Sequence, residues 1–282
     1  MKKINIILGM AIILGMMSCD KLKEPYFTEP LVAISDTIKL EEADTVNFDG
    51  KIVVLLEDFT GVQCQNCPSA AAVASSLQTS YGEKLIVLGV HPKTNFQNPA
   101  GGAFPDFRTD DAEAWRVFNN IEEFPNGMVN RLSVVGSSNW ASEVGNLIGG
   151  NAPVRLIVKT DYNDANRELR LSVHSKFLTD VNGDIRLTVC MMEDNITGRQ
   201  KTNTGVDDNY LHRHVFRGTA DGFTWGRPLD SETTTIVANR NFITNMKFTL
   251  DEAYNADEFY IVAFISDDSD KHVVMAAEAK IK

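Results

Sequence analysis

The sequence predicts an α/β domain over residues 49–152, followed by an all-β sandwich domain over residues 153–282. Two observations carry this prediction. In the first part, continuous apolar runs alternate with helix-like segments, which is the chain order of an α/β unit. In the second part, apolar and polar residues alternate in at least six segments separated by turn residues. The change of period places the boundary near Ala152.

The elements of the first part follow from composition and period. Residues 51–59 and 84–92 are continuous runs rich in Ile, Val and Leu, which predict strands buried on both faces. Residues 66–80 are rich in Ala and predict a helix that ends near Gly82. Residues 93–109 contain many Gly, Pro and Asn residues and predict a long loop.

Two further helices and a strand complete the predicted α/β unit. Residues 110–121 begin with acidic side chains, as helices often do, and place Ala114, Val117, Phe118 and Ile121 on one apolar stripe. The remaining elements are a turn and strand over 122–135 and a helix over 139–150.

The second part predicts strands and no helix. Its alternating segments are typical of an antiparallel, immunoglobulin-like sandwich. They cover residues 153–162, 169–177, 185–193, 245–251, 258–266 and 272–281.

The first 18 residues have the pattern of an export signal. Two lysines precede an apolar run that is too short for a comfortable membrane span, and Ser18 stands directly before Cys19. A cysteine at this place predicts a bacterial lipoprotein, cut before Cys19 and acylated on it. The alternative is a plain secreted protein in which Cys19 is incidental. In either case the chain enters an oxidising compartment where disulfides persist.

The charge of the chain excludes two classes of partner. The formal charge is −11, and loss of residues 1–18 with their two lysines makes it −13. This acidic balance argues against binding to nucleic acid, which needs a basic footprint, and against adhesion to anionic lipid. Membrane attachment would therefore depend on the acyl chains of Cys19. Residues 19–48 predict a tether, with a possible edge strand over 31–40.

Cys64 and Cys67 stand three apart, and Pro68 follows directly. A closed zinc site needs four ligands, and the nearest clustered candidates, His212 and His214, lie about 145 residues away. A dithiol fits better, because the pair falls between a predicted strand and the first turn of a predicted helix. There, the positive helix end stabilises a thiolate. Cys64 would attack and Cys67 would resolve the mixed disulfide, with Cys64 the more exposed member. An inert disulfide staple is the remaining alternative.

Residues 54–68 resemble thioredoxin. The strand ends in an Asp-Phe pair and is followed by a short loop, the cysteine pair and a helix. The resemblance implies that Asp58 is a buried acid that relays protons to Cys67, and that Pro125 is a cis-proline on the substrate loop, with Phe124 before it. The sequence departs from the family where Gln63 precedes the first cysteine and where Gln-Asn stands between the two cysteines. The direction of electron flow is therefore open.

A wider resemblance covers nearly the whole chain after the signal. The lipoprotein signal, the motifs EDFTG, CQNCP and FPNGMVNR, the β-rich second half and the segment NYLHRHVFRG followed by WG are similar to a family of outer-membrane lipoproteins. That family is named after a twenty-eight-kilodalton outer membrane protein of anaerobic Gram-negative bacteria. The resemblance implies a thioredoxin-like domain followed by a β-sandwich, and a location at the outer membrane.

Other chemically capable residues are assigned smaller roles. His212 and His214, with acidic neighbours, are weak metal-ligand candidates, and hydrogen-bonding or solvent-side histidines are the simpler interpretation. His91 is expected at the surface, and Trp225 is the best candidate for an exposed aromatic residue. The residues expected in the core are Cys190, Trp115 and Trp140.

Two functions remain open from the sequence. The first is thiol–disulfide exchange in the cell envelope, with exported protein thiols or disulfides as partners, a lipid anchor in the membrane and no cofactor. The second is a non-enzymatic binding lipoprotein in which the thioredoxin-like part is a scaffold and Cys64–Cys67 is inert. Exposure of Cys64 is the first observation that separates them.

Overall fold

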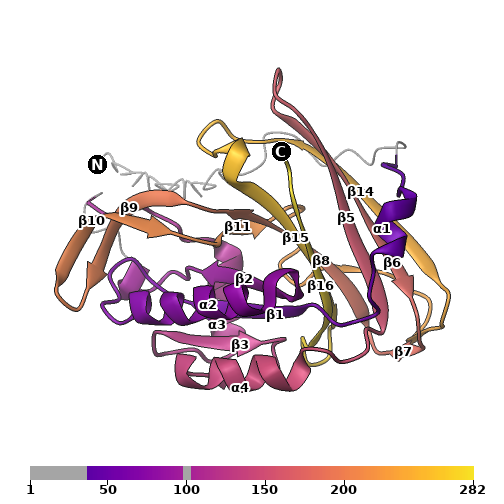
Figure 1. Ribbon diagram of the computed structural model, residues 1–282, viewed down its shortest axis with the longest axis horizontal. Helices are drawn as coiled ribbons and strands as arrows, with labels where there is room; N and C mark the ends of the chain where they lie inside the picture. The colour runs from indigo at the N-terminus through magenta and orange to yellow at the C-terminus, as the bar shows by residue number, and fades with distance from the viewer. Residues whose placement is uncertain (1–36, 98–102) are drawn as a thin grey trace, which may run out of the picture. The chain divides into compact units, whose positions relative to one another are not determined.

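A computed structural model describes residues 37–97 and 103–282, and it shows a mostly β fold with a small helical part (Figure 1). Cys19 and the predicted signal lie outside the described residues. So does most of the predicted tether. No helix within the described ranges is long and apolar enough to span a membrane.

One nine-stranded sheet runs through most of the described chain, in the order β16-β15-β8-β11-β2-β1-β3-β4, with β12 paired to β8. The inner pair, β1 and β2, is parallel, and β3 runs antiparallel to β1. On the other side, β11 joins β2 in parallel through Val215 and Gly89, and continues antiparallel into β8. The strands are β1 Val54–Phe59, β2 Leu85–Val90, β3 Asn126–Val129, β4 Val134–Val135, β8 Ile185–Glu193, β11 Val215–Thr219, β12 Arg227–Pro228, β15 Phe259–Asp267 and β16 Val273–Lys280.

Strands β1 and β2 are fully buried because both faces of the sheet are covered. One face packs on α2 (Cys67–Tyr81) and α4 (Ser137–Leu147) through Val54, Leu56 and Trp140. The other face carries Leu55, Phe59 and Leu88 and packs against α3 and the later strands. This cover explains the continuous apolar runs at residues 51–59 and 84–92.

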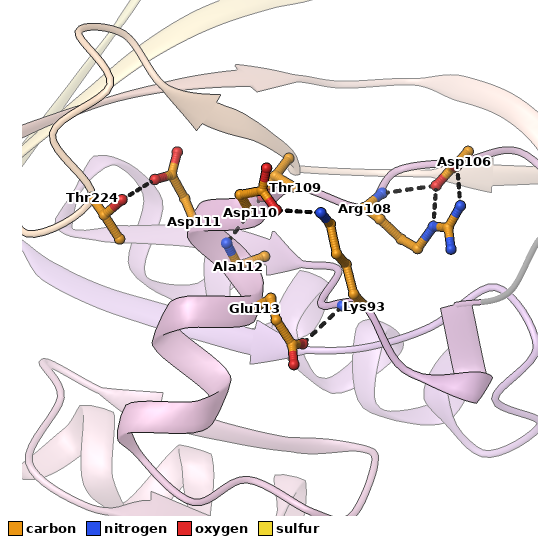
Figure 2. Close-up of polar contacts among 9 residues, drawn as sticks. All are labelled: Lys93, Asp106, Arg108, Thr109, Asp110, Asp111, Ala112, Glu113 and Thr224. Atoms are coloured by element: carbon orange, nitrogen blue, oxygen red, sulfur yellow. Dashed lines mark hydrogen bonds and ion pairs between the residues drawn. The ribbon is translucent and has the colours of Figure 1, made fainter. Parts of the chain in front are cut away.

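Helix α3 (Asp110–Phe118) is fastened to the sheet by polar contacts at its start (Figure 2). Thr109 caps it by accepting from the backbone N–H of Ala112 at 3.0 Å. Asp111 accepts hydrogen bonds from Thr219 and from the hydroxyl of Thr224. The helix is therefore held to β11 and the loop after it, more than 100 residues away in sequence.

The predicted apolar stripe of α3 is wrong at Val117 and Phe118, whereas Ile121, just after the helix, is buried as predicted. Ala112 and Trp115 are the buried residues of the helix, whereas Val117 is 55% and Phe118 is 49% exposed. The helix is turned so that Trp115, its largest side chain, stacks on Phe216 and donates a hydrogen bond to the carbonyl of Thr224. Burial of that ring outweighs burial of the smaller stripe.

A separate three-stranded sheet has the order β14-β6-β5, and β5 packs along β15 and β16. Its strands are β5 Val154–Asn163, β6 Glu168–Phe177 and β14 Asn241–Thr249. The predicted segments after residue 152 are thus strands, and no α-helix occurs between residues 153 and 282. However, β8, β11, β15 and β16 continue the sheet that holds β1. The two predicted domains therefore share a sheet, and their independence stays a prediction.

The described end of the predicted tether touches this second sheet. Thr37–Leu40 form no strand, because Ile38 bonds the side chains of Ser172 and His174 on β6 instead of a strand backbone. The short helix α1 (Glu42–Val46) follows, and Asp44 pairs with Lys159. The edge strand expected over residues 31–40 is therefore not seen in its described part. The small remaining pieces are η1 Gly82–Lys84, η2 Asn95–Gln97, β7 Val181–Asn182, β13 Thr235–Ile236 and η3 Ala256–Glu258.

Candidate functional site

The cysteine pair lies where strand β1 passes into helix α2. Cys64 and Cys67 form a disulfide with their Cα atoms 5.4 Å apart. Cys67 is the first residue of α2, and Pro68 stands in its first turn, where a missing backbone N–H costs no helical bond. The predicted strand–loop–helix setting of the pair is therefore present.

Both cysteines are buried, which corrects the expectation of an exposed Cys64: it is 2% exposed and Cys67 is 1% exposed. The cover is a hairpin of β9 (Ile196–Thr202) and β10 (Gly205–His212) that the sequence analysis did not predict. Gln200 is its contact point, donating from Nε2 to the carbonyls of Gly61 and Cys64, each at 3.1 Å. The backbone N–H of Lys201 adds a bond to the carbonyl of residue 62 at 2.8 Å.

Asp58 is buried in β1, 3% exposed, in register with Gly89 of the neighbouring strand. Its Oδ1 has no hydrogen-bond partner among the described residues. Burial without a compensating charge raises the pKa of this carboxyl to about 8. Asp58 is therefore mostly protonated at neutral pH and can give or take a proton within the physiological range.

The loop with Pro125 is linked to the cysteine loop by one residue. The Phe124–Pro125 peptide bond is cis. The ring of Phe124 lies 5.4 Å from that of Phe96, and the carbonyl of Phe96 accepts a hydrogen bond from the backbone N–H of Gln63. The role of Pro125 in holding a substrate segment stays a prediction.

A cavity of about 330 Å³ lies beside Cys67. It is bounded by the first half of α2, by β1 and β2, and by the end of the β9–β10 hairpin with the turn after it. Asp58 and Cys67 both line it. The remaining lining residues that matter here are Ala72, Ser75, His91, Gln200, Tyr210, Leu211, His212, Arg213 and His214.

Three histidines of this cavity are buried: His91 is 4%, His212 is 4% and His214 is 8% exposed. This corrects the predicted surface position of His91 and the solvent-side alternative for His212 and His214. His91 bonds the carbonyl of Gly89 through Nδ1 at 3.0 Å. The two later histidines are not on one strand, since β10 ends at His212 and His214 has φ 55°. Within the described ranges, no three His, Cys, Asp or Glu side chains gather as metal ligands.

Burial also changes the protonation of these histidines. It lowers the pKa of His91 to about 3 and that of His212 to about 4, with carbonyls of β9 opposing the shift at His212. Burial likewise lowers the pKa of His214. All three imidazoles are therefore neutral at pH 7.

The remaining candidates lie in the core or near it. Cys190, Trp115 and Trp140 are fully buried, as predicted. Trp225 is only half-exposed, because Phe118 packs on its ring at 5.0 Å and the Lys271 ammonium lies over it. Sequence reasoning missed Gln200 and Tyr210, for which no spacing signal exists. Only the hairpin that follows β8 brings them to the cysteine pair.

The profile of the family described as outer membrane protein Omp28 matches residues 113–282 of the chain. The chain belongs to the Omp28 family. The matched part holds Pro125, Gln200 and the late histidines, and it begins after Asp58, Cys64 and Cys67. Membership therefore agrees with the family resemblance of the sequence, and it does not by itself assign chemistry to the cysteine pair.

Solved structures add a likeness of fold. HBP35 of Porphyromonas gingivalis superposes with a TM-score of 0.62 at 20% identity, over 82% of this chain and 76% of that one. A protein of Agrobacterium tumefaciens gives a TM-score of 0.49 at 10% identity, covering 82% and 96%. A domain of the outer membrane lipoprotein Omp28 from Porphyromonas gingivalis gives 0.31 at 18%, covering 46% and 89%. No curated protein matches the chain.

Proposed function

We propose that this Omp28-family chain is a thiol–disulfide exchange protein of the cell envelope, anchored to the outer membrane through Cys19. The observation that carries the proposal is the Cys64–Cys67 disulfide at the start of α2, with the buried Asp58 lining the same cavity as Cys67. Strongly shifted pKa values cluster at functional sites, so the raised pKa of Asp58 beside a cysteine pair supports the proposal.

The proposal includes a thioredoxin-like fold for residues 49–152. Three features support it: β1 leads into the cysteine pair and α2, β2 runs parallel to β1, and β3 returns antiparallel after Pro125. In this fold the pair stands at the carboxyl end of β1, where the positive end of α2 stabilises a thiolate at Cys64.

The reaction runs in two steps. A substrate thiolate attacks Cys64 Sγ; the new substrate–Cys64 disulfide forms, the Cys64–Cys67 bond breaks, and Cys67 leaves as a thiolate that takes the proton of Asp58. A second substrate thiolate then attacks the substrate sulfur of the mixed disulfide and releases Cys64 as a thiolate. The substrate dithiol is oxidised by two electrons and the cysteine pair is reduced. The reverse sequence reduces a substrate disulfide, with Asp58 accepting the proton.

This role of Asp58 predicts a pH dependence. Asp58 donates its proton only below its pKa of about 8. We therefore expect the second-order rate constant for oxidation of a dithiol to fall above pH 8, when it is calculated from the concentration of the attacking thiolate rather than of the total thiol. Asp58→Asn should lose that inflection and react roughly 10²-fold more slowly below it, the lower range for a positioned proton donor. Stopped-flow kinetics from pH 6 to 10 measures this. An unchanged profile in Asp58→Asn would remove Asp58 from the reaction.

The same group predicts a pH dependence of stability. Because its pKa is about 8 in the folded chain and 3.8 in the unfolded one, the stability that Asp58 contributes is fully present below pH 3.8 and is lost as pH rises from there through 8. In Asp58→Asn that loss should be absent.

The exchange reaction requires the β9–β10 hairpin to move off Cys64, which is 2% exposed. Gln200→Ala removes the side-chain bonds to Gly61 and Cys64. We expect the disulfide of this variant to be reduced by dithiothreitol about 5- to 10-fold faster, as the loss of about 1 kcal/mol of closed-state stabilisation allows. Gln65→Ala, at an exposed position between the two cysteines, is the matched control and should leave the rate unchanged. Equal rates for Gln200→Ala and the wild type would show that the hairpin does not gate Cys64.

The anchor is tested separately. Cys19→Ser should move the protein from the membrane fraction to the soluble fraction, since the acidic chain has no other predicted means of adhesion. Cys190→Ser is the control and should stay with the membrane. Sedimentation of Cys19→Ser with membranes would contradict lipid anchoring.

A second function is favoured by one observation, the burial of both sulfurs. In it, the disulfide is an inert staple and the chain is a binding lipoprotein. The two functions differ in the reduction potential of the pair, which for structural disulfides lies below about −300 mV.

A further inference from the structure

The sheet of β5, β6 and β14 has one apolar, buried face and one polar face. Along β5, Val154, Leu156 and Val158 are buried, so the alternate residues Arg155 and Lys159 stand on the polar face. Three cations of this face are neutralised by ion pairs, which are Lys159–Asp44, Arg170–Asp161 and Lys247–Glu168. The polar face therefore carries little net charge where these pairs lie.

Two further cations of the polar face have no such partner. Arg155 of β5 stands directly opposite Lys176 of β6, and neither side chain forms an ion pair or a hydrogen bond within the described ranges. Like charges that face each other on neighbouring strands destabilise a sheet. The acids of α1 do not compensate them, because Asp44 pairs with Lys159, four residues and about 13 Å from Arg155 along β5. That distance exceeds the screening length of about 8 Å at physiological salt.

The start of the described chain crosses the same polar face. Asn245 of β14 donates to the Thr37 hydroxyl at 3.0 Å. On β6, Ser172 accepts from the backbone N–H of Ile38 at 2.9 Å, and His174 bonds its carbonyl at 2.8 Å. Figure 1 shows the helix α1, which follows this segment, beside the same sheet. The chain therefore joins the folded part at the face that carries the two unpaired cations.

The place of this crossing limits how the chain can lie at a membrane. Thr37 is 18 residues after Cys19, and a fully extended segment of that length spans at most about 60 Å. An acyl anchor on Cys19 keeps the polar face within this distance of the bilayer, so even a weak attraction between them acts at a high effective concentration. The tether thus favours lipid over an acidic protein as the anion that meets the unpaired cations.

We propose that the polar face, at Arg155 and Lys176, docks on anionic lipid headgroups of the membrane that holds Cys19. The inference rests on the lipid anchor of the proposed function and is independent of disulfide exchange. A headgroup phosphate accepts charge-assisted hydrogen bonds from both cations and removes their mutual repulsion. One basic side chain strengthens such a contact about 5-fold, and two strengthen it about 30-fold. This attraction is too weak to hold the free acidic chain at a membrane, but it orients a chain that the tether already holds there.

Docking is tested on the chain from Cys19 to Lys282 coupled to vesicles. Cys19 reacts with a maleimide lipid, because the other three cysteines are in a disulfide or fully buried. The vesicles contain phosphatidylcholine alone, or phosphatidylcholine and phosphatidylglycerol in equal parts. Acetylation by an N-hydroxysuccinimide ester, followed by mass spectrometry, measures the accessibility of each lysine.

The expected result is a protection confined to the polar face. Lys176 should be acetylated about 5-fold or more slowly on the anionic vesicles than on the neutral ones. Lys201, an exposed residue of the β9–β10 hairpin, should be acetylated at equal rates on both. About 1 M sodium chloride, where the screening length is about 3 Å, should abolish the protection of Lys176.

A matched pair of substitutions locates the contact. Arg155→Gln removes one of the two facing cations and leaves Lys176 as the reporter, so most of the protection should be lost. Lys201→Gln removes a cation of the hairpin and should leave the protection of Lys176 unchanged. Equal acetylation of Lys176 on neutral and anionic vesicles, or protection that survives in Arg155→Gln or in high salt, overturns the proposal. Because the maleimide lipid supplies the anchor, these results are independent of the fractionation of Cys19→Ser, which tests the anchor itself.

Discussion

Cys64→Ser is expected to abolish exchange, and Cys67→Ser is expected to accumulate a mixed disulfide with substrate protein. Cys64 is the sulfur that the substrate attacks, and without Cys67 no internal thiol is placed to release the intermediate. Cys190 cannot replace it, because that thiol is fully buried and burial raises its pKa well above the usual value. The variants are expressed in cells, quenched with acid, alkylated and analysed on non-reducing gels, where the trapped complex identifies the partner.

Cys190→Ser serves as the control for this pair and should exchange at the wild-type rate. One combination of results would contradict the exchange function. If Cys67→Ser forms no more mixed disulfide than Cys64→Ser, and the wild-type pair has a reduction potential below about −300 mV, the disulfide is a structural staple. The chain is then a binding lipoprotein whose buried sulfurs are explained by their position under the hairpin.

Local structure could be predicted from the sequence because it depends on short-range signals. The apolar run that ends at Phe59 and the proline after Cys67 placed β1 and the start of α2 within a few residues. Alternation predicted strands β5, β6, β8, β14, β15 and β16.

Long-range pairing could not be predicted in this way. The sheet continues from β2 into β11 through Val215 and Gly89, which are 126 residues apart. The two strands can approach closely because Gly89 has no side chain. A Cβ atom there would lie 3.3 Å from the carbonyl oxygens of residues 213 and 214. That approach brings His214 and the hairpin before it over the cysteine pair. Together with the bonds of Gln200 to Gly61 and Cys64, this contact accompanies the burial of Cys64 and the site histidines. The periodicity of apolar residues does not predict such a contact between distant residues.

The partner of Glu57 could not be predicted from the sequence either, although Glu57 stands in a predicted strand next to Asp58. Glu57 is 0% exposed and points to the face of β1 opposite the cavity, where Arg131 meets it with contacts of 2.6 to 3.1 Å. The guanidinium also lies 4.4 Å from the centre of the Trp115 ring and 4.8 Å from that of Phe264. The ion pair is therefore enclosed by the core that joins β1, α3 and β15.

Removing one member of this pair is expected to be the most destabilising change short of a core deletion. Arg131→Met keeps an unbranched, apolar side chain at a residue with φ 58° and leaves Glu57 as an uncompensated buried carboxylate. The free energy of unfolding in urea should fall by about 3–5 kcal/mol. In the double variant Glu57→Leu, Arg131→Met no charge is left buried, and most of that loss should be recovered.

The surface pair Arg108–Asp106 supplies the control for this experiment, because both its side chains are at least one-third exposed. Arg108→Met should therefore cost less than about 1 kcal/mol. If Arg131→Met and Arg108→Met lower the unfolding free energy equally, Glu57 is not held as a buried ion. If instead only Arg131→Met is strongly destabilised, the Glu57–Arg131 ion pair stabilises β1, the strand that carries Asp58, on the face opposite the cavity. The cavity side of β1 is then free to keep the unpaired carboxyl on which the proposed proton transfer depends.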